Sequence, residues 1–377
     1  MVLARTRPFQ PSRLALVARC ALRYVKETEP SSERFLPPDL RMLFGRAVHD
    51  IIDQGVAADG DVRTALIDHV MQALQALDAP LPRWAVRHGL PPSSIVQPSA
   101  LAGWVRFARL SRSDAGRRGD GGRGRAQAMF GREILLDDPR HDLAGRADRV
   151  DNGGTMTVVT DFKTGGLRLE GGGDHRVQLL AYGLLVAERD RRSVELVAIS
   201  PTETNMLVFD AAAREEIESI LLAARDRLPR GVELKPETLA TPGKICLGCR
   251  YRLTCPVYPA WAERHWRDPT MRTPFDVWGQ VLRVELRNDL AALVIVAPNG
   301  SLARVNGVPL EPAEEPPRPG MPVRLLSLVS SERGGGGGRP VNFVAVDLGR
   351  LAGSAWGAWV DLRSFGDPSP VFEPIRR

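Results

Sequence analysis

The 377-residue chain has no run of eighteen apolar residues, and its first ten residues, MVLARTRPFQ, lack the apolar stretch of a secretory signal. A membrane-spanning helix, which needs about 20 apolar residues, is therefore not expected. We expect a cytoplasmic protein with no membrane partner. A P-loop, with its lysine and serine or threonine at fixed spacing, is also missing, so ATP hydrolysis by this chain is not expected.

Lysine and histidine are scarce. Of 51 basic residues only four are lysines, and histidine occurs six times. A cation that serves solubility alone would in this chain usually be arginine. Lys163, a lysine beside acidic residues, is therefore a candidate functional residue. The net charge of +6 is moderate and suits a polyanionic partner.

Cysteine is scarce as well, and three of the four cysteines form a C-x2-C-x5-C cluster before Pro256. Cytoplasmic proteins rarely keep disulfides, so this clustering predicts a metal site. Four thiolates suit either tetrahedral zinc or a [4Fe-4S] cluster. The distant cysteine lies on a predicted helix capped by Ser12, and it would join the two ends of one domain. The set is Cys20, Cys246, Cys249 and Cys255.

Two acidic residues are predicted to meet at the end of a sheet. Asp148 lies in an apolar segment, and after a Gly153-Gly154 turn the alternating run 155–162 leads to Asp161 and Lys163. Two carboxylates bind hard divalent ions such as Mg²⁺, and the backbone carbonyl of Phe162 is a candidate third ligand. The lysine would offset charge that builds up on a phosphate under attack.

Three further residues are candidates for the same site. Gln178 and Tyr182 are four residues apart on a predicted helix and therefore share a face. His49 lies beside the apolar stripe of a predicted helix over 39–55, where a lone histidine is more often structural. Glu133, on a predicted strand over 127–136, is either an additional acidic contact or a strand-surface residue.

These motifs resemble the RecB-type branch of the PD-(D/E)XK nucleases over roughly residues 10 to 260. The matching segments are G-x-x-D at Gly145 to Asp148, D-F-K-T-G at Asp161 to Gly165, Q-x-x-x-Y at Gln178 to Tyr182, and His49 in G-R-A-V-H. The resemblance implies catalytic roles for Asp148, Asp161, Lys163, Gln178 and Tyr182. It also implies that Mg²⁺ or Mn²⁺ is held by His49, Asp148, Asp161 and Phe162.

The one-plus-three arrangement of the cysteines, closed by a proline, resembles the iron–sulfur members of this branch, namely AddB and the CRISPR-associated RecB-like enzymes. This resemblance implies a structural [4Fe-4S] cluster bound by Cys20, Cys246, Cys249 and Cys255, with zinc as the alternative.

The predicted fold class is α/β, with a restriction-endonuclease-like core in a domain over 1–268. Its expected elements are strands over 127–136, 142–150 and 155–163, a helix over 175–189 and a strand over 194–200. A helical insertion is expected at about 56–126. It ends in an arginine- and glycine-rich segment over 111–127 that is either a solvated loop or an arm gripping phosphates.

From Pro274 onward the pattern changes to short alternating strands with an Asn299-Gly300 hairpin signal. We predict a small all-β, OB-like barrel in a domain over 269–377, with a loop over 331–340. Such a barrel either binds single strands, where Trp278, Trp356 and Trp359 could stack on bases, or serves as a structural or docking module.

The predicted function is metal-dependent hydrolysis of DNA, by an exonuclease or a nuclease that prefers single strands, in repair, recombination or defence. The expected partners are DNA, single-stranded or with free ends, and a separate helicase or a CRISPR or defence protein. Two alternatives stay open: a nucleic-acid-binding scaffold with an idle nuclease fold, and an enzyme that trims DNA ends during CRISPR adaptation.

Overall fold

The computed structural model describes residues 3–29, 45–51, 61–75, 105, 108, 130–163, 165–190, 192–252, 255–265, 275–287, 290–309, 317–330, 341–344 and 359–361. The chain divides into two compact units; among the described residues, one boundary lies between Leu66 and Ile67 and another between Val257 and Tyr258. The predicted domain boundary at 268/269 lies outside the described residues, as do most of the predicted insertion, the segments 111–127 and 331–340, and Trp356.

The first unit contains a five-stranded sheet in the order β1-β2-β3-β4-β5. Only β3 and β4 run parallel, and α6 connects them; the other neighbouring pairs are antiparallel. The predicted order of three strands, helix and strand is confirmed. The elements are β1 (Gly131–Asp138), β2 (Leu143–Asn152), β3 (Met156–Phe162), α6 (Asp174–Ala187), β4 (Ser193–Ile199) and β5 (Thr204–Val208).

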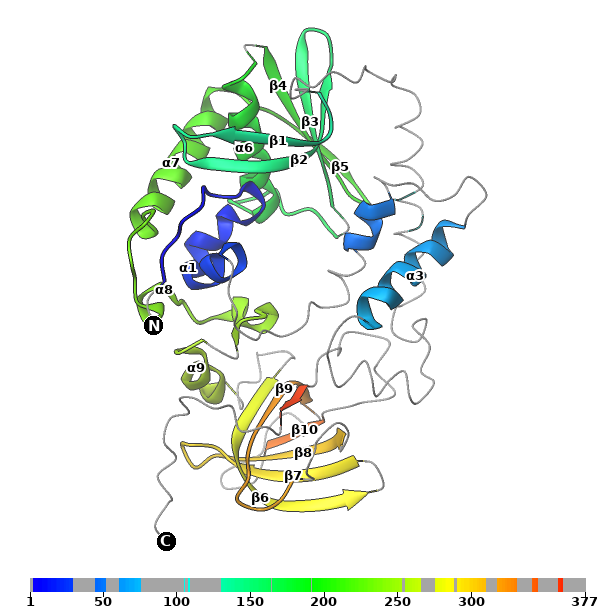
Figure 1. Cartoon of the computed structure of the whole chain (residues 1–377), viewed down its shortest axis with the longest axis vertical. Helices are drawn as coiled ribbons and strands as arrows, with labels where there is room; N and C mark the ends of the chain where they lie inside the picture. The colour runs from blue at the N-terminus through cyan, green and yellow to red at the C-terminus, as the bar shows by residue number, and fades with distance from the viewer. Residues whose placement is uncertain are drawn as a thin grey trace. The chain divides into compact units, whose positions relative to one another are not determined.

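Helix α6 is the centre of this unit. It packs against β1 to β4 and also against α1 (Leu14–Thr28) and α7 (Ala211–Arg227) (Figure 1). All ten residues from Val177 to Val186 are buried, which explains why this helix has a nearly continuous apolar sequence instead of one apolar stripe. Smaller elements of the unit are η1 (Pro11–Arg13), α8 (Pro236–Leu239), η4 (Lys244–Gly248) and a helical stretch over 45–51.

The start of α1 corrects one prediction. Ser12 does not cap the helix: it lies inside η1, and the residue before α1 is Arg13, which provides no side-chain cap. The physical reason is Pro11, whose fixed φ begins a tight turn one residue before the expected cap. The helix is also interrupted at Cys20, whose backbone is extended.

The first residues of the chain run as a strap across the unit. Leu3 pairs with Leu234, and Phe9 pairs with Leu143 of β2. Between them the buried Arg5 donates from Nε to the carbonyl of Leu228 at 3.1 Å. The strap therefore ties the N-terminal segment to residues more than two hundred positions later in the chain.

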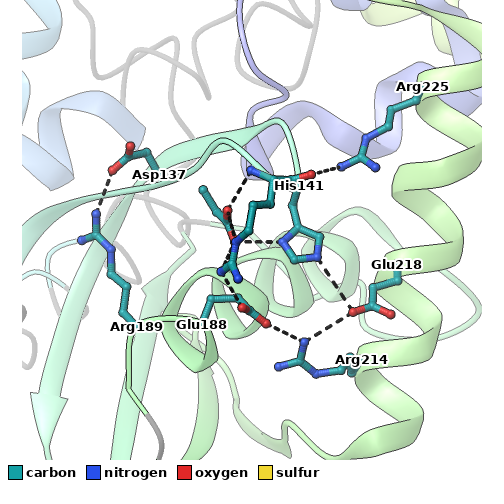
Figure 2. A network of polar contacts seen from close by, with 9 residues as sticks. Asp137, His141, Glu188, Arg189, Arg214, Glu218 and Arg225 are labelled. Carbon is teal, nitrogen blue, oxygen red and sulfur yellow. Dashed lines mark hydrogen bonds and ion pairs between the residues drawn. The ribbon is translucent and has the colours of Figure 1, made fainter.

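A polar network fastens the turn between β1 and β2 to α6 and α7 (Figure 2). Asp138 accepts from Arg140 and lies 2.8 Å from Nδ1 of His141. Arg140 in turn contacts Glu188 at 2.5 Å, and Glu188 is shared with Arg214 of α7. Burial alone would raise the pKa of Asp138, but the hydrogen bonds from His141 and Arg140 lower it to about 2.

Replacing Asp138 by asparagine should reduce the free energy of unfolding by about 2 kcal/mol at neutral pH. Because the pKa of Asp138 is lower in the folded state, its stabilisation is present above the ordinary value of 3.8 and is lost as the pH falls through about 2. Urea unfolding at several pH values measures this. The matched control is Asp137→Asn, whose half-exposed carboxylate pairs with Arg189 and should contribute little. Equal losses from both changes would contradict the role of the network.

The second unit contains α9 (Tyr258–Arg264) and a six-stranded sheet in the order β10-β8-β7-β6-β9-β11, with a further pairing between β10 and β9. Strands β8 and β10 are parallel, and the other paired strands are antiparallel. The predicted hairpin at Asn299-Gly300 is confirmed, with Gly300 at φ 81°. The strands are β6 (Phe275–Arg287), β7 (Leu290–Val296), β8 (Leu302–Pro309), β9 (Pro322–Ser330), β10 (Val341–Val344) and β11 (Trp359–Asp361).

Trp278 of β6 packs beside Tyr258 of α9, with ring centroids 6.2 Å apart. The remaining helix in the described part of the chain is α3 (Val62–Gln75). Within the described residues, no helix has both the length and the apolar character needed to cross a bilayer.

Candidate metal centre

The pairing of β2 with β3 brings Asp148 and Asp161 together. Arg149 is opposite Thr160 in this antiparallel pair, so Asp148, one residue before Arg149, and Asp161, one residue after Thr160, are the next opposing positions. Oδ2 of Asp148 also accepts the backbone N–H of Phe162 at 2.7 Å. The predicted convergence of the two carboxylates at one end of the sheet is therefore present in the structure.

The glycine of the G-x-x-D segment is required by close packing. A Cβ atom at Gly145 would lie 2.6 Å from the ring of Pro11 and 3.3 Å from the ring of Tyr182. The hydroxyl of Tyr182 donates to the backbone carbonyl of Arg146 at 2.5 Å. Burial, and then the charges of Asp161 and Asp148, raise the pKa of Tyr182, so this hydroxyl stays protonated and keeps β2 against α6.

Asp161 is almost fully buried, at 1% exposure, and has two side-chain neighbours. Nε2 of Gln178 donates to its Oδ1 at 2.8 Å, and Nζ of Lys163 lies 2.6 Å from its Oδ2. The backbone N–H of Lys163 donates to the carbonyl of Ile199 on β4, which fixes the chain where β3 ends. Gln178 thus orients the carboxylate, and Lys163 neutralises it.

A second group shares Asp148 with this pair and consists of His49, Glu133 and Asp148. One ligand atom from each lies within 4.8 Å of the others, and all three side chains are half-buried. Glu133 faces Asp148 because its neighbours Arg132 and Ile134 pair with the residues on either side of Asp148. Glu133 is therefore part of the site.

The backbone of Glu133 has a φ of 50°, which is uncommon for a residue other than glycine. The sequence left this residue undecided between an acidic contact and the strand surface. Strand alternation in a sequence assigns each side chain to one face of the sheet. It does not reveal an unusual backbone angle, so this feature of Glu133 could not be predicted from the sequence.

The electrostatics of the site fit a divalent cation. Burial, followed by the negative charge of Asp161, raises the pKa of Asp148 to about 6. Oδ2 of Asp161 is buried and accepts no hydrogen bond of normal geometry, although Lys163 lies close to it. Carboxylates placed together in this way gain from a bound cation, and carboxylate oxygens suit Mg²⁺ or Mn²⁺.

The cysteines lie in the first unit, and none forms a disulfide with another. Burial raises the pKa of Cys246 to about 11, and the neighbouring Cys249, Cys255 and Cys20 contribute to this rise. The other three sulfurs are thus within electrostatic range of Cys246. Among the described residues, however, no three of the sulfurs lie within 4.8 Å of each other, so the structure contains no compact thiolate centre.

Comparison with known proteins places the chain in a family. Residues 8–256 match the model of the PD-(D/E)XK nuclease superfamily, and the chain belongs to that superfamily. The superfamily consists of metal-dependent nucleases, and the acidic site and mixed sheet described above agree with that assignment.

Curated proteins gave no match to this chain. Among solved structures, the chain is similar to the one titled "Crystal structure of SSO0001", with 20% sequence identity over 47% of this chain and 80% of that chain, and a TM-score of 0.24. The family assignment rests on the match to the family model.

Proposed function

We propose that this protein is a metal-dependent deoxyribonuclease of the RecB-type branch, acting on single-stranded DNA or on DNA with free ends. The observation that carries this proposal is the meeting of Asp148 and Asp161 with Lys163, 2.6 Å from Asp161, beside His49 and Glu133. Acidic ligands next to one partly buried ammonium are the arrangement that metal-assisted phosphodiester hydrolysis needs.

In this proposal Asp148, Asp161 and His49 hold the cation, together with the carbonyl of Phe162 and the carboxylate of Glu133. Mg²⁺ or Mn²⁺ bound there supplies an activated water and a positive charge against the phosphate. Lys163 orients that water or neutralises the charge that develops on the phosphate. Gln178 fixes Asp161 by its hydrogen bond, and Tyr182 fixes β2 through the carbonyl of Arg146.

We further propose that Cys20, Cys246, Cys249 and Cys255 bind a [4Fe-4S] cluster with a structural role. The support is the placement of all four cysteines in one unit, within electrostatic range of Cys246. Four thiolates also suit a single tetrahedral zinc ion, which stays the alternative.

For the second unit we propose an OB-like barrel, which corresponds to the predicted domain over 269–377. The support is its strand pairing: β6, β7, β8 and β10 are neighbours in turn, and β9 pairs with both β10 and β6. An OB-fold is a five-stranded Greek-key barrel. We propose that this barrel either binds single-stranded DNA or docks a helicase or a CRISPR protein.

The direct test is cleavage of end-labelled DNA by protein prepared anaerobically. We expect the wild type to degrade labelled DNA with Mn²⁺ or Mg²⁺ and to leave it intact with a chelator. Single-stranded, blunt and circular substrates, each labelled separately at the 5′ and 3′ ends, distinguish exonuclease from endonuclease action. Absence of metal-dependent cleavage on every substrate would favour the idle scaffold instead.

A further inference from the structure

The loop between β3 and α6 is folded on itself, although five of its residues are glycine. Gly173 donates to the carbonyl of Glu170 at 2.9 Å, and Arg176 donates to the carbonyl of Arg168 at 3.3 Å. Gly171 and Gly172 have positive φ values, and a Cβ at Gly173 would lie 2.3 Å from the carbonyl oxygen of Arg168. These contacts give the loop over 165–173 a defined conformation directly after Lys163.

His175, in the first turn of α6, holds this loop. Its Nδ1 is 3.0 Å from the backbone N–H of Arg168, so Nδ1 accepts a hydrogen bond and must be unprotonated. Burial, and then the positive charges of Lys163 and Arg168, lower the pKa of His175; Asp161 and Asp174 act in the opposite direction. At neutral pH the ring is therefore neutral and able to accept the hydrogen bond.

Arg168 is the exposed cation on this loop. Its side chain is 64% exposed, and Asp174, an acidic neighbour, lies 3.6 Å away. Asp174 also pairs with Arg19 of α1, so it offsets the charge of Arg168 only in part. Lys163 and Arg168 both lower the pKa of His175, so each lies within electrostatic range of that ring, and Lys163 also contacts Asp161 of the acidic centre at 2.6 Å.

We propose that Arg168 binds a backbone phosphate of the substrate next to the bond that is cut, and that His175 is the positioning residue that holds Arg168 in place. This inference rests on the proposed function, because the phosphate belongs to the strand that the acidic centre hydrolyses. Consecutive phosphates along one strand are close enough for adjacent cations to contact neighbouring groups. Arg168 thus contributes to binding of the strand and takes no part in the chemical step.

The variants that test this are Arg168→Ala, His175→Leu and His175→Asn. Asparagine has an oxygen near the position of Nδ1 and retains the acceptor, whereas leucine removes it. The control is Arg140→Ala, whose side chain is similarly exposed, at 68%, and lies at the turn between β1 and β2. Thermal unfolding of each variant checks that the fold is kept.

Two readouts separate positioning from a general structural effect. The first is the salt dependence of binding of a fluorescent single-stranded oligodeoxynucleotide with all divalent metal chelated. Loss of one phosphate contact should reduce the slope of log Kd against log salt concentration by roughly 0.7. The second is steady-state cleavage with Mn²⁺, where KM should rise about fivefold with kcat nearly unchanged.

We expect Arg168→Ala and His175→Leu to show both changes, and His175→Asn and Arg140→Ala to keep the wild-type slope and KM. Arg140→Ala also loses its contacts with Asp138 and Glu188, so its thermal midpoint should be lower than that of the wild type. An Arg168→Ala protein with the wild-type slope and KM would overturn the inference even if the wild type cleaves DNA. Equal behaviour of the two His175 variants would overturn the positioning role alone. A wild type that binds DNA without cleaving it would instead contradict the proposed function, and the binding slope would still decide the role of Arg168.

Discussion

Replacing Asp161 by asparagine should reduce the rate of DNA cleavage by roughly 1,000-fold or more, with the fold intact. The buried carboxylate is oriented by Gln178 and is paired with Lys163. Asparagine has the same shape and can still accept the hydrogen bond from Gln178, but it removes the negative charge that would hold the cation. Initial rates at saturating Mg²⁺ or Mn²⁺ give the change, and circular dichroism checks the fold.

A matched control is available on the neighbouring strand. Asp151 of β2 is also mostly buried and pairs with Arg149 at 2.7 Å, so Asp151→Asn makes the same chemical change in the same sheet. It should leave cleavage within about twofold of the wild type. Lys163→Ala should show a loss of roughly 100- to 1,000-fold, because it removes stabilisation of charge on the phosphate. Equal cleavage by wild type, Asp161→Asn and Lys163→Ala would refute the assignment of the catalytic centre.

The second large effect concerns the cysteines. Protein prepared anaerobically should be brown and contain about four irons per chain, and Cys249→Ser should contain almost none. Because a cluster bound by the native state stabilises that state, its loss should also lower the thermal midpoint of the first unit by roughly 10 °C or more. Metal analysis and calorimetry on the same preparations measure both quantities.

Cys20→Ser is the informative companion, since Cys20 is more than two hundred residues away from the other three in the chain. If all four thiolates bind one cluster, both variants should lose iron and stability to a similar extent. Zinc in place of iron would correct the identity of the metal. A stable wild type with neither metal bound would rule out the thiolate site, and the activity test of Asp161→Asn would be unaffected by that result.

The sequence alone predicted most of the first unit. Strand β3 and helix α6 begin and end within two residues of the expected ranges, because alternation and a long apolar helix are local signals. The approach of Asp148 to Asp161 was also predictable, since a short turn between two strands fixes which residues oppose each other. Lys163 was singled out because lysine is scarce in this chain.

Other features depend on contacts between distant segments. The hydrogen bond from Gln178 to Asp161 depends on how α6 lies across the sheet, and periodicity gives only the face of the helix. Glu133 joins the site because of the register in which β1 pairs with β2, and Ser12 is displaced from its expected cap by Pro11. Local secondary-structure propensity predicts neither of these two features.

The strap formed by the first residues has a consequence for synthesis on the ribosome. Arg5 and the carbonyl that it contacts at Leu228 are 223 positions apart, so the segment around Arg5 must wait for its partners until most of the first unit has been translated. Until then Phe9 and the apolar side of α1 lack part of their native packing, and this exposed apolar surface favours aggregation. Truncated nascent chains that stop before Leu228 should therefore be recovered largely as protease-sensitive intermediates.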